Sequence, residues 1–211
     1  MNLYFRLLFN VIRSLFQQRL PTSGRIVSNF RVWPHDLDAF GHMNNGRYLQ
    51  IMDVARASWM TRTGVIETMR GMRWGASLGG GTVRFRRSLK PFQRYQVTTR
   101  LIGWDDRWFY LEHGFLDTDA RCIAVGLSRA ALRGARDWVH TDTVLELVDP
   151  TAPPLPIPDY VRQLTSLEET LYREFCRDQQ AINAARHSEA SELERTVPAP
   201  SFRCMEIEKR R

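Results

Sequence analysis

Acidic, imidazole and amide side chains gather in one short stretch of the sequence. From residue 34 to 48 the residues are Pro-His-Asp-Leu-Asp-Ala-Phe-Gly-His-Met-Asn-Asn-Gly-Arg-Tyr. A carboxylate can act as a general base toward water or attack a carbonyl carbon directly. Histidine and asparagine side chains can hold water or a carbonyl oxygen through hydrogen bonds. This stretch is therefore the first candidate for a catalytic site.

A helix is expected directly after this stretch. Either Asn44 or Asn45 can cap it, and Gly64 provides a C-terminal stop, so we predict a central helix from Gly46 to Thr63. The apolar residues at helical spacing are Tyr48, Ile51, Met52, Ala55 and Trp59. The N-terminus of a helix carries unpaired amides and about half a positive charge, which can polarise a carbonyl oxygen or hold an oxyanion. We expect the amides of Gly46 and Arg47 to be the donors.

The other predicted elements are strands, rich in branched and aromatic residues and separated by turn-forming residues. They span residues 25–33, 76–89, 94–103, 107–116 and 121–133. Glycines 79–81 are expected to bend the second strand or to form a bulge. The connections between the last four strands are too short for parallel crossovers, which predicts a largely antiparallel sheet.

The loop and its surroundings resemble a known family. The pattern Asp-x-Asp-x-x-x-His-x-Asn-Asn-x-x-Tyr, beginning at Asp36, is similar to that of hotdog-fold thioesterases of the 4-hydroxybenzoyl-CoA type. The resemblance extends in element order over residues 25–133, roughly half of the chain. It implies an α+β hotdog fold, in which a five-stranded antiparallel sheet wraps around one long helix, with extra helices at both ends.

The resemblance also implies roles for individual residues and partners. Asp38 would be the general base or nucleophile, while Asp36 would shape the loop. The residues implied to position water or the carbonyl are His42 and Asn44 or Asn45, and Tyr48 would line the acyl pocket. The implied reaction is hydrolysis of an acyl-CoA thioester by a homodimer or a dimer of dimers, with the active site at the subunit junction. No cofactor is implied.

Basic residues are the second functional signal. Between Thr68 and Trp104 the sequence contains eight basic residues and no acidic one. Arginine grips phosphate through paired, charge-assisted hydrogen bonds, so Arg86, Arg87 and Lys90 are assigned to the phosphates of coenzyme A. Strand alternation places Arg86 and Arg87 on opposite faces. A solvated basic sheet edge that prevents aggregation is the alternative.

Other interpretations of the same residues stay open. The loop could be a capped turn without catalytic duty, or His35, Asp36, Asp38 and His42 could hold a metal, although we expect no metal site. The tryptophans and other aromatic residues are assigned to packing rather than to nucleic acid. Two further function classes remain: a thioesterase acting on acyl carrier protein, which is acidic, and a non-catalytic acyl or lipid-binding hotdog module.

Composition sets the broad class of the protein. The 211 residues carry a net charge of +7, which suits an anionic partner, and 43% of them are hydrophobic. No apolar run approaches the roughly 18 residues of a membrane span. The three cysteines are widely spaced and odd in number, as is typical of a reducing compartment. We expect a cytoplasmic protein with surface contact to membranes as an alternative.

The ends of the chain are expected to be appendages to one domain. Residues 1–20 form an amphipathic basic helix, which either packs on its own domain or rests on a membrane surface. We assign residues 25–140 to the thioesterase domain and 141–185 to a proline-rich connector followed by a helix that Ser166 and Glu169 cap. Residues 186–211 are expected to be a flexible tail.

Overall fold

The computed structural model describes residues 3–196 of the chain. The elements in chain order are α1 (Leu3–Leu15), β1 (Ile26–Arg31), a 3-10 turn (Pro34–Asp36), α2 (Asn45–Thr63), α3 (Val65–Met72), β2 (Gly75–Phe85), β3 (Arg94–Trp104), β4 (Phe109–Leu116), β5 (Cys122–Arg133), β6 (Trp138–Val139), α4 (Thr141–Val148) and α5 (Asp159–Thr196). The chain divides after Pro158 into two compact units. The first unit contains every element from α1 to α4, and the second contains α5.

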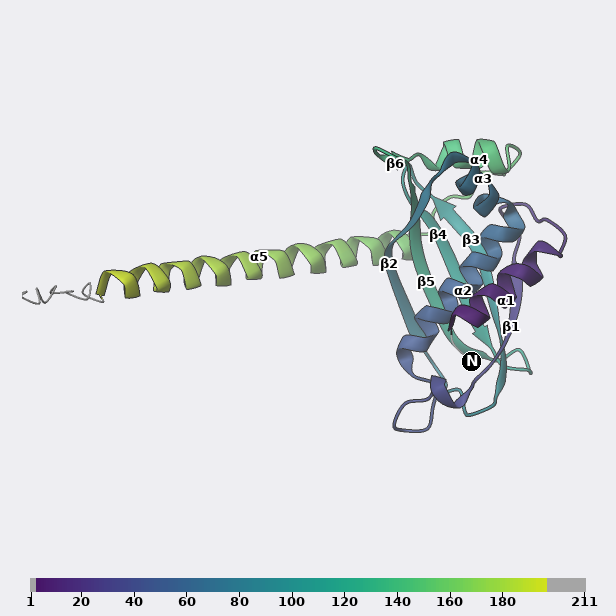
Figure 1. Ribbon diagram of the computed structural model, residues 1–211, viewed down its shortest axis with the longest axis horizontal. Coiled ribbons are helices and arrows are strands. Elements are labelled where there is room, and N and C mark those ends of the chain that lie inside the picture. Colours follow the sequence, from purple (N-terminus) through teal and green to yellow (C-terminus); the bar gives the residue numbers. More distant parts are fainter. Residues whose placement is uncertain (1–2, 197–211) are drawn as a thin grey trace, which may run out of the picture. The chain divides into compact units, whose positions relative to one another are not determined.

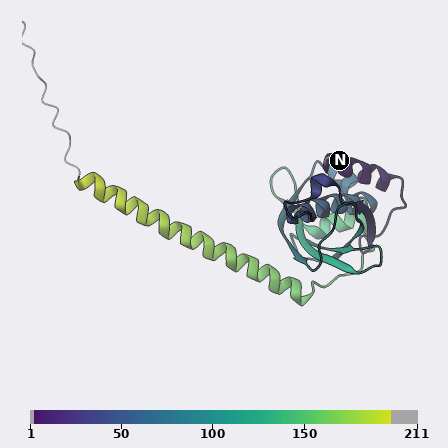
Figure 2. The same ribbon diagram turned by 90° about the horizontal axis from the view of Figure 1, so that it is seen from below.

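One sheet makes up most of the first unit, and it curls around helix α2 (Figures 1 and 2). The strand order is β1-β3-β4-β5-β2, every neighbouring pair is antiparallel, and the two-residue β6 pairs with the end of β5. This arrangement confirms the predicted α+β hotdog fold with five main strands around one helix. The short strand β6 is an addition to the prediction.

Helix α2 lies at the centre of the core because its buried side chains are mostly large and apolar. It buries Tyr48, Ile51, Met52, Val54, Ala55 and Trp59. Burying one large side chain of this kind stabilises the fold by about 1.5–3 kcal/mol. Gly126 of β5 lets the helix approach the sheet, since a Cβ at this position would lie 2.5 Å from the sulfur of Met52.

Both ends of α2 follow from single residues. The Asn44 side chain caps the N-terminus and accepts a hydrogen bond of 2.8 Å from the Gly46 amide. Gly64 ends the helix with a φ of 85°, in the left-handed region that favours glycine. These boundaries agree with the prediction, and they identify Asn44 rather than Asn45 as the cap.

Strand β2 is shorter than predicted. It ends at Phe85, because the amides of Arg86 and Arg87 both donate to the Ile123 carbonyl, at 2.9 and 3.1 Å, and strand alternation stops there. The prediction that the two arginines occupy opposite faces of a strand is therefore wrong. The expected bulge is present, as the pairing of β2 with β5 shifts register between Leu78 and Gly80.

The C-terminal part differs from the predicted connector and tail. Helix α4 lies where the connector was expected to begin, and it buries Val144 and Leu145 against the rest of the first unit. Helix α5 begins at Asp159, so Ser166 lies inside the helix and does not cap it. The helix also continues past residue 185 to Thr196, whereas residues 197–211 of the predicted tail lie outside the described residues.

Helix α1 packs against α2 with its polar stripe inward. Its buried residues are Arg6, Asn10 and Ser14, and Leu3 and Leu7 pack beside them against the core. This orientation reverses the usual one, in which an amphipathic helix turns its polar stripe to the solvent. Within residues 3–196, no helix combines the length and hydropathy that crossing a bilayer requires.

Candidate functional site

The loop between the 3-10 turn and α2 is closed by hydrogen bonds to Asp38. The Asp38 amide donates to the His42 carbonyl at 2.9 Å, and Oδ1 of the Asp38 side chain accepts from the amides of Phe40 and His42 at 2.9 and 3.3 Å. Gly41 makes the turn with a φ of 76°. The second carboxylate oxygen, Oδ2, has no hydrogen-bond partner among the described residues. One oxygen of Asp38 thus holds the loop, and the other remains available.

Asp36, the first acid of the motif, is buried and anchors the loop. Its Oδ2 accepts from the Arg6 guanidinium at 2.5 Å and from the Trp33 amide at 2.8 Å. Its carbonyl accepts from the Asn44 amide at 2.8 Å, and Nε of Arg47 lies 3.6 Å from its Oδ1. Asp36 therefore connects α1, the 3-10 turn and the first turn of α2, which is the loop-shaping position predicted for it.

A cavity of about 420 Å³ opens beside this loop. Its lining residues are Asp38, Phe40, His42, Met43, Asn45, Tyr48, Phe85, Arg86, Arg87 and Ser88. Six residues predicted from sequence for catalysis or substrate binding are among them. The loop, the first turn of α2 and the segment that follows β2 come together here, although 50 positions separate Asp38 from Ser88 in the sequence.

The amides that are free to donate at the N-terminus of α2 are not the ones expected from the sequence. The Gly46 amide donates to Oδ1 of Asn44, and the Arg47 amide donates to the Asn44 carbonyl at 2.9 Å. Both predicted donors are therefore engaged in capping the helix. The Asn45 amide has no acceptor among the described residues, and Asn45 lines the cavity. The available positive end of the helix is thus the Asn45 amide.

The predicted residues Asn44, Gly46 and Arg47 do not line the cavity. The Arg47 side chain turns back to the loop, where it donates to the His35 carbonyl at 2.9 Å and to Gln50 at 2.6 Å. These three residues form the tip of α2 rather than a surface for substrate.

Tyr48 forms an aromatic side of the cavity. Its ring contacts those of Phe85 and Phe115 edge-on or tilted, with centroids 4.9 and 5.1 Å apart. Burial raises the pKa of the Tyr48 phenol, and a hydrogen bond with the Leu89 backbone opposes this shift. The phenol is therefore neutral at ordinary pH and presents an apolar ring.

Basic side chains lie at the mouth of this cavity and beside it. Arg86 and Arg87 are exposed and have no acidic partner among the described residues. Lys90 lines a neighbouring cavity of about 600 Å³, which Arg87 and Ser88 also border. Arg121, in the same neighbouring cavity, is paired with Asp117 at 2.8 Å. The structure thus brings all three predicted phosphate contacts to one region.

Four lining residues were not among the predicted site residues: Phe40, Met43, Phe85 and Ser88. The sequence signal for Phe40 was a large apolar residue within a turn of polar residues. In the structure its side chain is 85% exposed. Among the described residues, no group of three or more His, Cys, Asp or Glu side chains is arranged to bind a metal ion.

Comparison with known proteins places this architecture in a family. The family model of the thioesterase-like superfamily matches residues 32–164, which is more than half of the chain. Protein THEM6 of Drosophila melanogaster is 37% identical over 131 residues, covering 61% of this chain and 68% of that protein. Protein THEM6 of Xenopus laevis is 44% identical over 85 residues, but the match spans only 40% of this chain and 41% of that protein.

Solved structures share the fold at low sequence identity. A gentisyl-coenzyme A thioesterase, BH1999, is 23% identical with a TM-score of 0.51 over 60% of this chain and 100% of its own. The 1,4-dihydroxy-2-naphthoyl-CoA thioesterase Slr0204 from Synechocystis is 14% identical with a TM-score of 0.53, over 62% and 100% respectively. The family model matches from the residue after β1 through the other strands and α4 to residue 164, so the chain belongs to the thioesterase-like superfamily.

Proposed function

We propose that the protein hydrolyses acyl thioesters in the cavity beside Asp38. The observation that carries this proposal is the meeting of two groups in one cavity. Within the described part of the chain, the Asp38 carboxylate has one oxygen without a partner, and the Asn45 amide at the positive end of α2 has no acceptor. Catalysis of acyl transfer requires at least a base or nucleophile and a donor that stabilises the oxyanion.

In the simplest route Asp38 acts on water. Oδ2 takes a proton from a water molecule as its oxygen bonds to the thioester carbon, and the carbonyl electrons move to oxygen. The Asn45 amide and the helix dipole stabilise that oxyanion. The oxyanion then collapses, the carbon–sulfur bond breaks, and the thiolate leaves and takes up a proton.

Direct attack by Asp38 is the other route. Its carboxylate would displace the thiolate and form a mixed anhydride, which water then hydrolyses to the free acid. Label from ¹⁸O-water in the Asp38 peptide after turnover establishes direct attack, whereas an unlabelled peptide fits general-base hydrolysis or attack of water on the acyl carbon of the anhydride. When water attacks the carboxyl carbon of Asp38, the label enters the enzyme, and mass spectrometry of the Asp38 peptide detects it. General-base hydrolysis leaves that peptide unlabelled.

Coenzyme A is the proposed carrier of the acyl group because of the cations around the cavity. Arg86, Arg87 and Lys90 line this cavity and its neighbour, and their side chains are suitable charge-assisted donors for the phosphates of a nucleotide. The same cations would suit an acidic carrier protein, which is the second candidate. Comparing thiol release from acyl-CoA and from carrier-bound acyl groups decides between them.

We further propose that the active unit is a homodimer joined through β2. This strand ends the sheet and has no further strand partner among the described residues. Residues 75–83 of β2 contain no charge and are largely exposed, whereas sheet edges that face solvent are usually protected by charges or proline. A second subunit pairing here would cover this edge.

The test of the proposed chemistry uses two substitutions at Asp38. In Asp38→Asn the amide oxygen can still accept from Phe40 and His42, so the loop is kept while the carboxylate is lost. We expect thiol release from acyl-CoA esters to fall by about 10²–10⁴-fold with the melting temperature nearly unchanged. Asp38→Ala should lose both the activity and the loop hydrogen bonds.

Two results would contradict the proposal. Full activity of Asp38→Asn would remove Asp38 from the reaction. Absence of thiol release by the wild type from every acyl-CoA and carrier-bound ester would favour the non-catalytic acyl-binding module.

A further inference from the structure

Helix α1 presents an almost continuous apolar surface to the outside. Its exposed large side chains are Tyr4, Phe5, Leu8, Phe9, Ile12 and Leu15. Phe16, directly after the helix, is 87% exposed. Contiguous apolar surface of this kind is uncommon on soluble proteins and marks a site of interaction.

The outward orientation of this surface is held by a buried ion pair. Arg6 is 4% exposed and Asp36 1% exposed, and the Arg6 guanidinium also lies 3.4 Å from the Arg31 carbonyl. Turning α1 over to bury its apolar residues would leave Asp36 without this partner, and unpairing a buried charge is strongly destabilising. The apolar face is therefore outward as a consequence of the fold.

Cations flank this apolar surface. Arg31 of β1 and Arg94 of β3 lie directly opposite each other, and neither has an acidic partner among the described residues. Like charges at opposed positions of a strand pair repel. An anion bound between them would relieve that repulsion.

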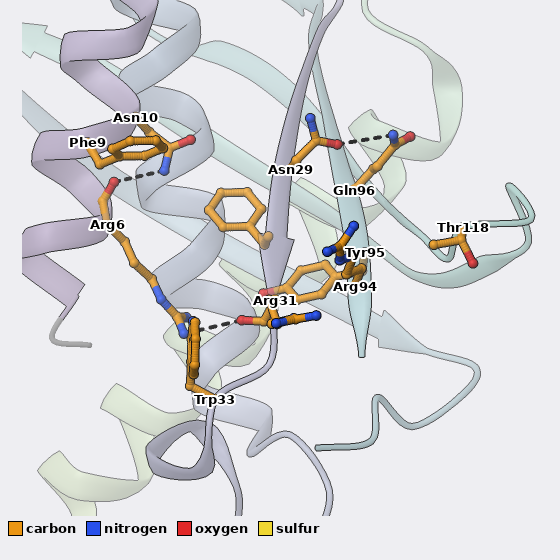
Figure 3. Close-up of a pocket in the computed structure, with 11 residues that line it drawn as sticks. Arg6, Phe9, Asn10, Asn29, Arg31, Trp33, Arg94, Tyr95, Gln96 and Thr118 are labelled. Carbon is orange, nitrogen blue, oxygen red and sulfur yellow. Dashed lines mark hydrogen bonds between the residues drawn. The ribbon is translucent and has the colours of Figure 1, made fainter. Parts of the chain in front are cut away.

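The two arginines border a cavity of about 590 Å³ between α1 and the sheet edge. Figure 3 shows Phe9 and Asn10 approaching from α1, and Arg31 and Arg94 from the strands. The apolar face and a cationic recess are thus neighbours, with Phe9 common to both. Arg13 adds an exposed cation on the helix itself.

We propose that α1 docks this protein on the surface of an anionic phospholipid bilayer. The outward side chains of α1 enter the boundary of the acyl chains, and Arg31 and Arg94 hold a lipid phosphate in the adjoining recess. This is the mode of helices that lie in the membrane interface, with apolar burial supplemented by attraction to anionic lipids. A second copy fits the surface less well, since a two-fold contact would bring flanking arginines of the two copies together.

The experiment is flotation of the full chain with vesicles. One set contains phosphatidylcholine alone, and the other contains about one third phosphatidylglycerol. We expect the wild type to float with the anionic set and at least tenfold less with the neutral one. The triple variant Phe5→Gln, Leu8→Gln, Ile12→Gln should lose flotation, while Val125→Gln with Leu147→Gln, exposed apolar residues elsewhere, should keep it.

The charge arm compares two pairs of arginines. Arg31→Gln with Arg94→Gln should weaken anionic vesicle binding by about tenfold or more, since each cation near the surface adds to the attraction. Arg133→Gln with Arg136→Gln removes the same charge at exposed positions away from α1 and should change binding little.

Three outcomes would overturn the proposal. The first is no flotation of the wild type, or flotation that the triple variant retains. The second is a smaller oligomer in the triple variant by light scattering, which would make a second copy the occupant of the surface. The third is a raised KM for acyl-CoA in the Arg31 and Arg94 pair with unchanged vesicle binding, which would assign the recess to the substrate.

Discussion

At the scale of single residues, His113 of β4 is a buried group that the proposed reaction does not use. It is fully buried, Nδ1 lies 3.0 Å from the Thr99 hydroxyl and Nε2 lies 3.0 Å from the Ser128 hydroxyl. Burial lowers the pKa of His113 to about 3, and the positive charge of Arg56 contributes to the shift. The imidazole therefore stays neutral and joins β3, β4 and β5.

This neutral histidine predicts acid sensitivity. In the unfolded chain its pKa is about 6.5, so the unfolded state gains a proton as pH falls from 6.5 toward 3 and the folded state does not. This contribution to stability is fully present well above pH 6.5, and between pH 7 and 4.5 about 2.5 kcal/mol of it should be lost. In His113→Gln, urea unfolding at the two pH values should show a smaller loss. An equal loss in both proteins would assign the acid sensitivity to other groups.

Asn45 permits a test of the oxyanion donor that leaves the helix intact. It is the first residue of α2, where proline is favoured because its missing N–H has no role in the helix. Asn44, with φ of −57° and ψ of 138°, already has the backbone conformation that precedes proline. Asn45→Pro should therefore fold normally but lower kcat by about 10²–10³-fold.

The control for this test is Asn45→Ala, which removes the side chain and keeps the amide. If Asn45→Ala loses as much activity as Asn45→Pro, the side chain and not the amide is responsible. Melting curves of both variants check that the helix is retained.

At the scale of elements, Gly79 allows the Trp108 side chain to pack directly on β2. The ring of Trp108 lies over Gly79, where a Cβ would meet ring carbons at 2.2 Å. The same Trp108 ring is near Trp138, with centroids 6.0 Å apart, and the Arg107 guanidinium lies over both. The bulge at Gly79 is thus the place where the outer aromatic cluster contacts the strand.

Two neighbouring substitutions measure this contact. Gly79→Ala must displace Trp108 and should destabilise the protein by about 1–3 kcal/mol. Gly81→Ala places its Cβ no closer than 3.7 Å to any atom and should cost much less. Urea unfolding of the two variants gives the comparison, and equal costs would show that loss of glycine in the strand, rather than the tryptophan, is the cause.

At the scale of the whole molecule, the open edge of β2 predicts self-association. The wild type should have twice the 24.6 kDa of one chain by light scattering. Ser77→Lys with Leu78→Lys places charges along β2 and should give a monomer. Val27→Lys with Asn29→Lys alters the opposite sheet edge, β1, and should leave the dimer intact. A monomeric wild type, or a dimer disrupted only through β1, would reject the proposed interface.

Several features could be predicted from the sequence alone because they depend on residues that are close together in the chain. The cap at Asn44, the stop at Gly64 and the apolar spacing between them define α2 because each acts within one or two turns of helix. Short connections leave only antiparallel pairing, so the sequence predicted an antiparallel sheet, and the resemblance to hotdog thioesterases implied that it wraps around α2. The spacing from Asp36 to Tyr48 is local as well, and it predicted a candidate site in the loop before α2.

Other features depend on groups distant in sequence, and only the tertiary structure decided them. Arg86 and Arg87 share a cavity because the Ile123 carbonyl, on another strand, accepts both amides. The outward apolar face of α1 depends on Asp36, 30 positions beyond Arg6. Helical periodicity defines two faces but not which of them meets the domain, because that choice depends on the partner that the fold supplies.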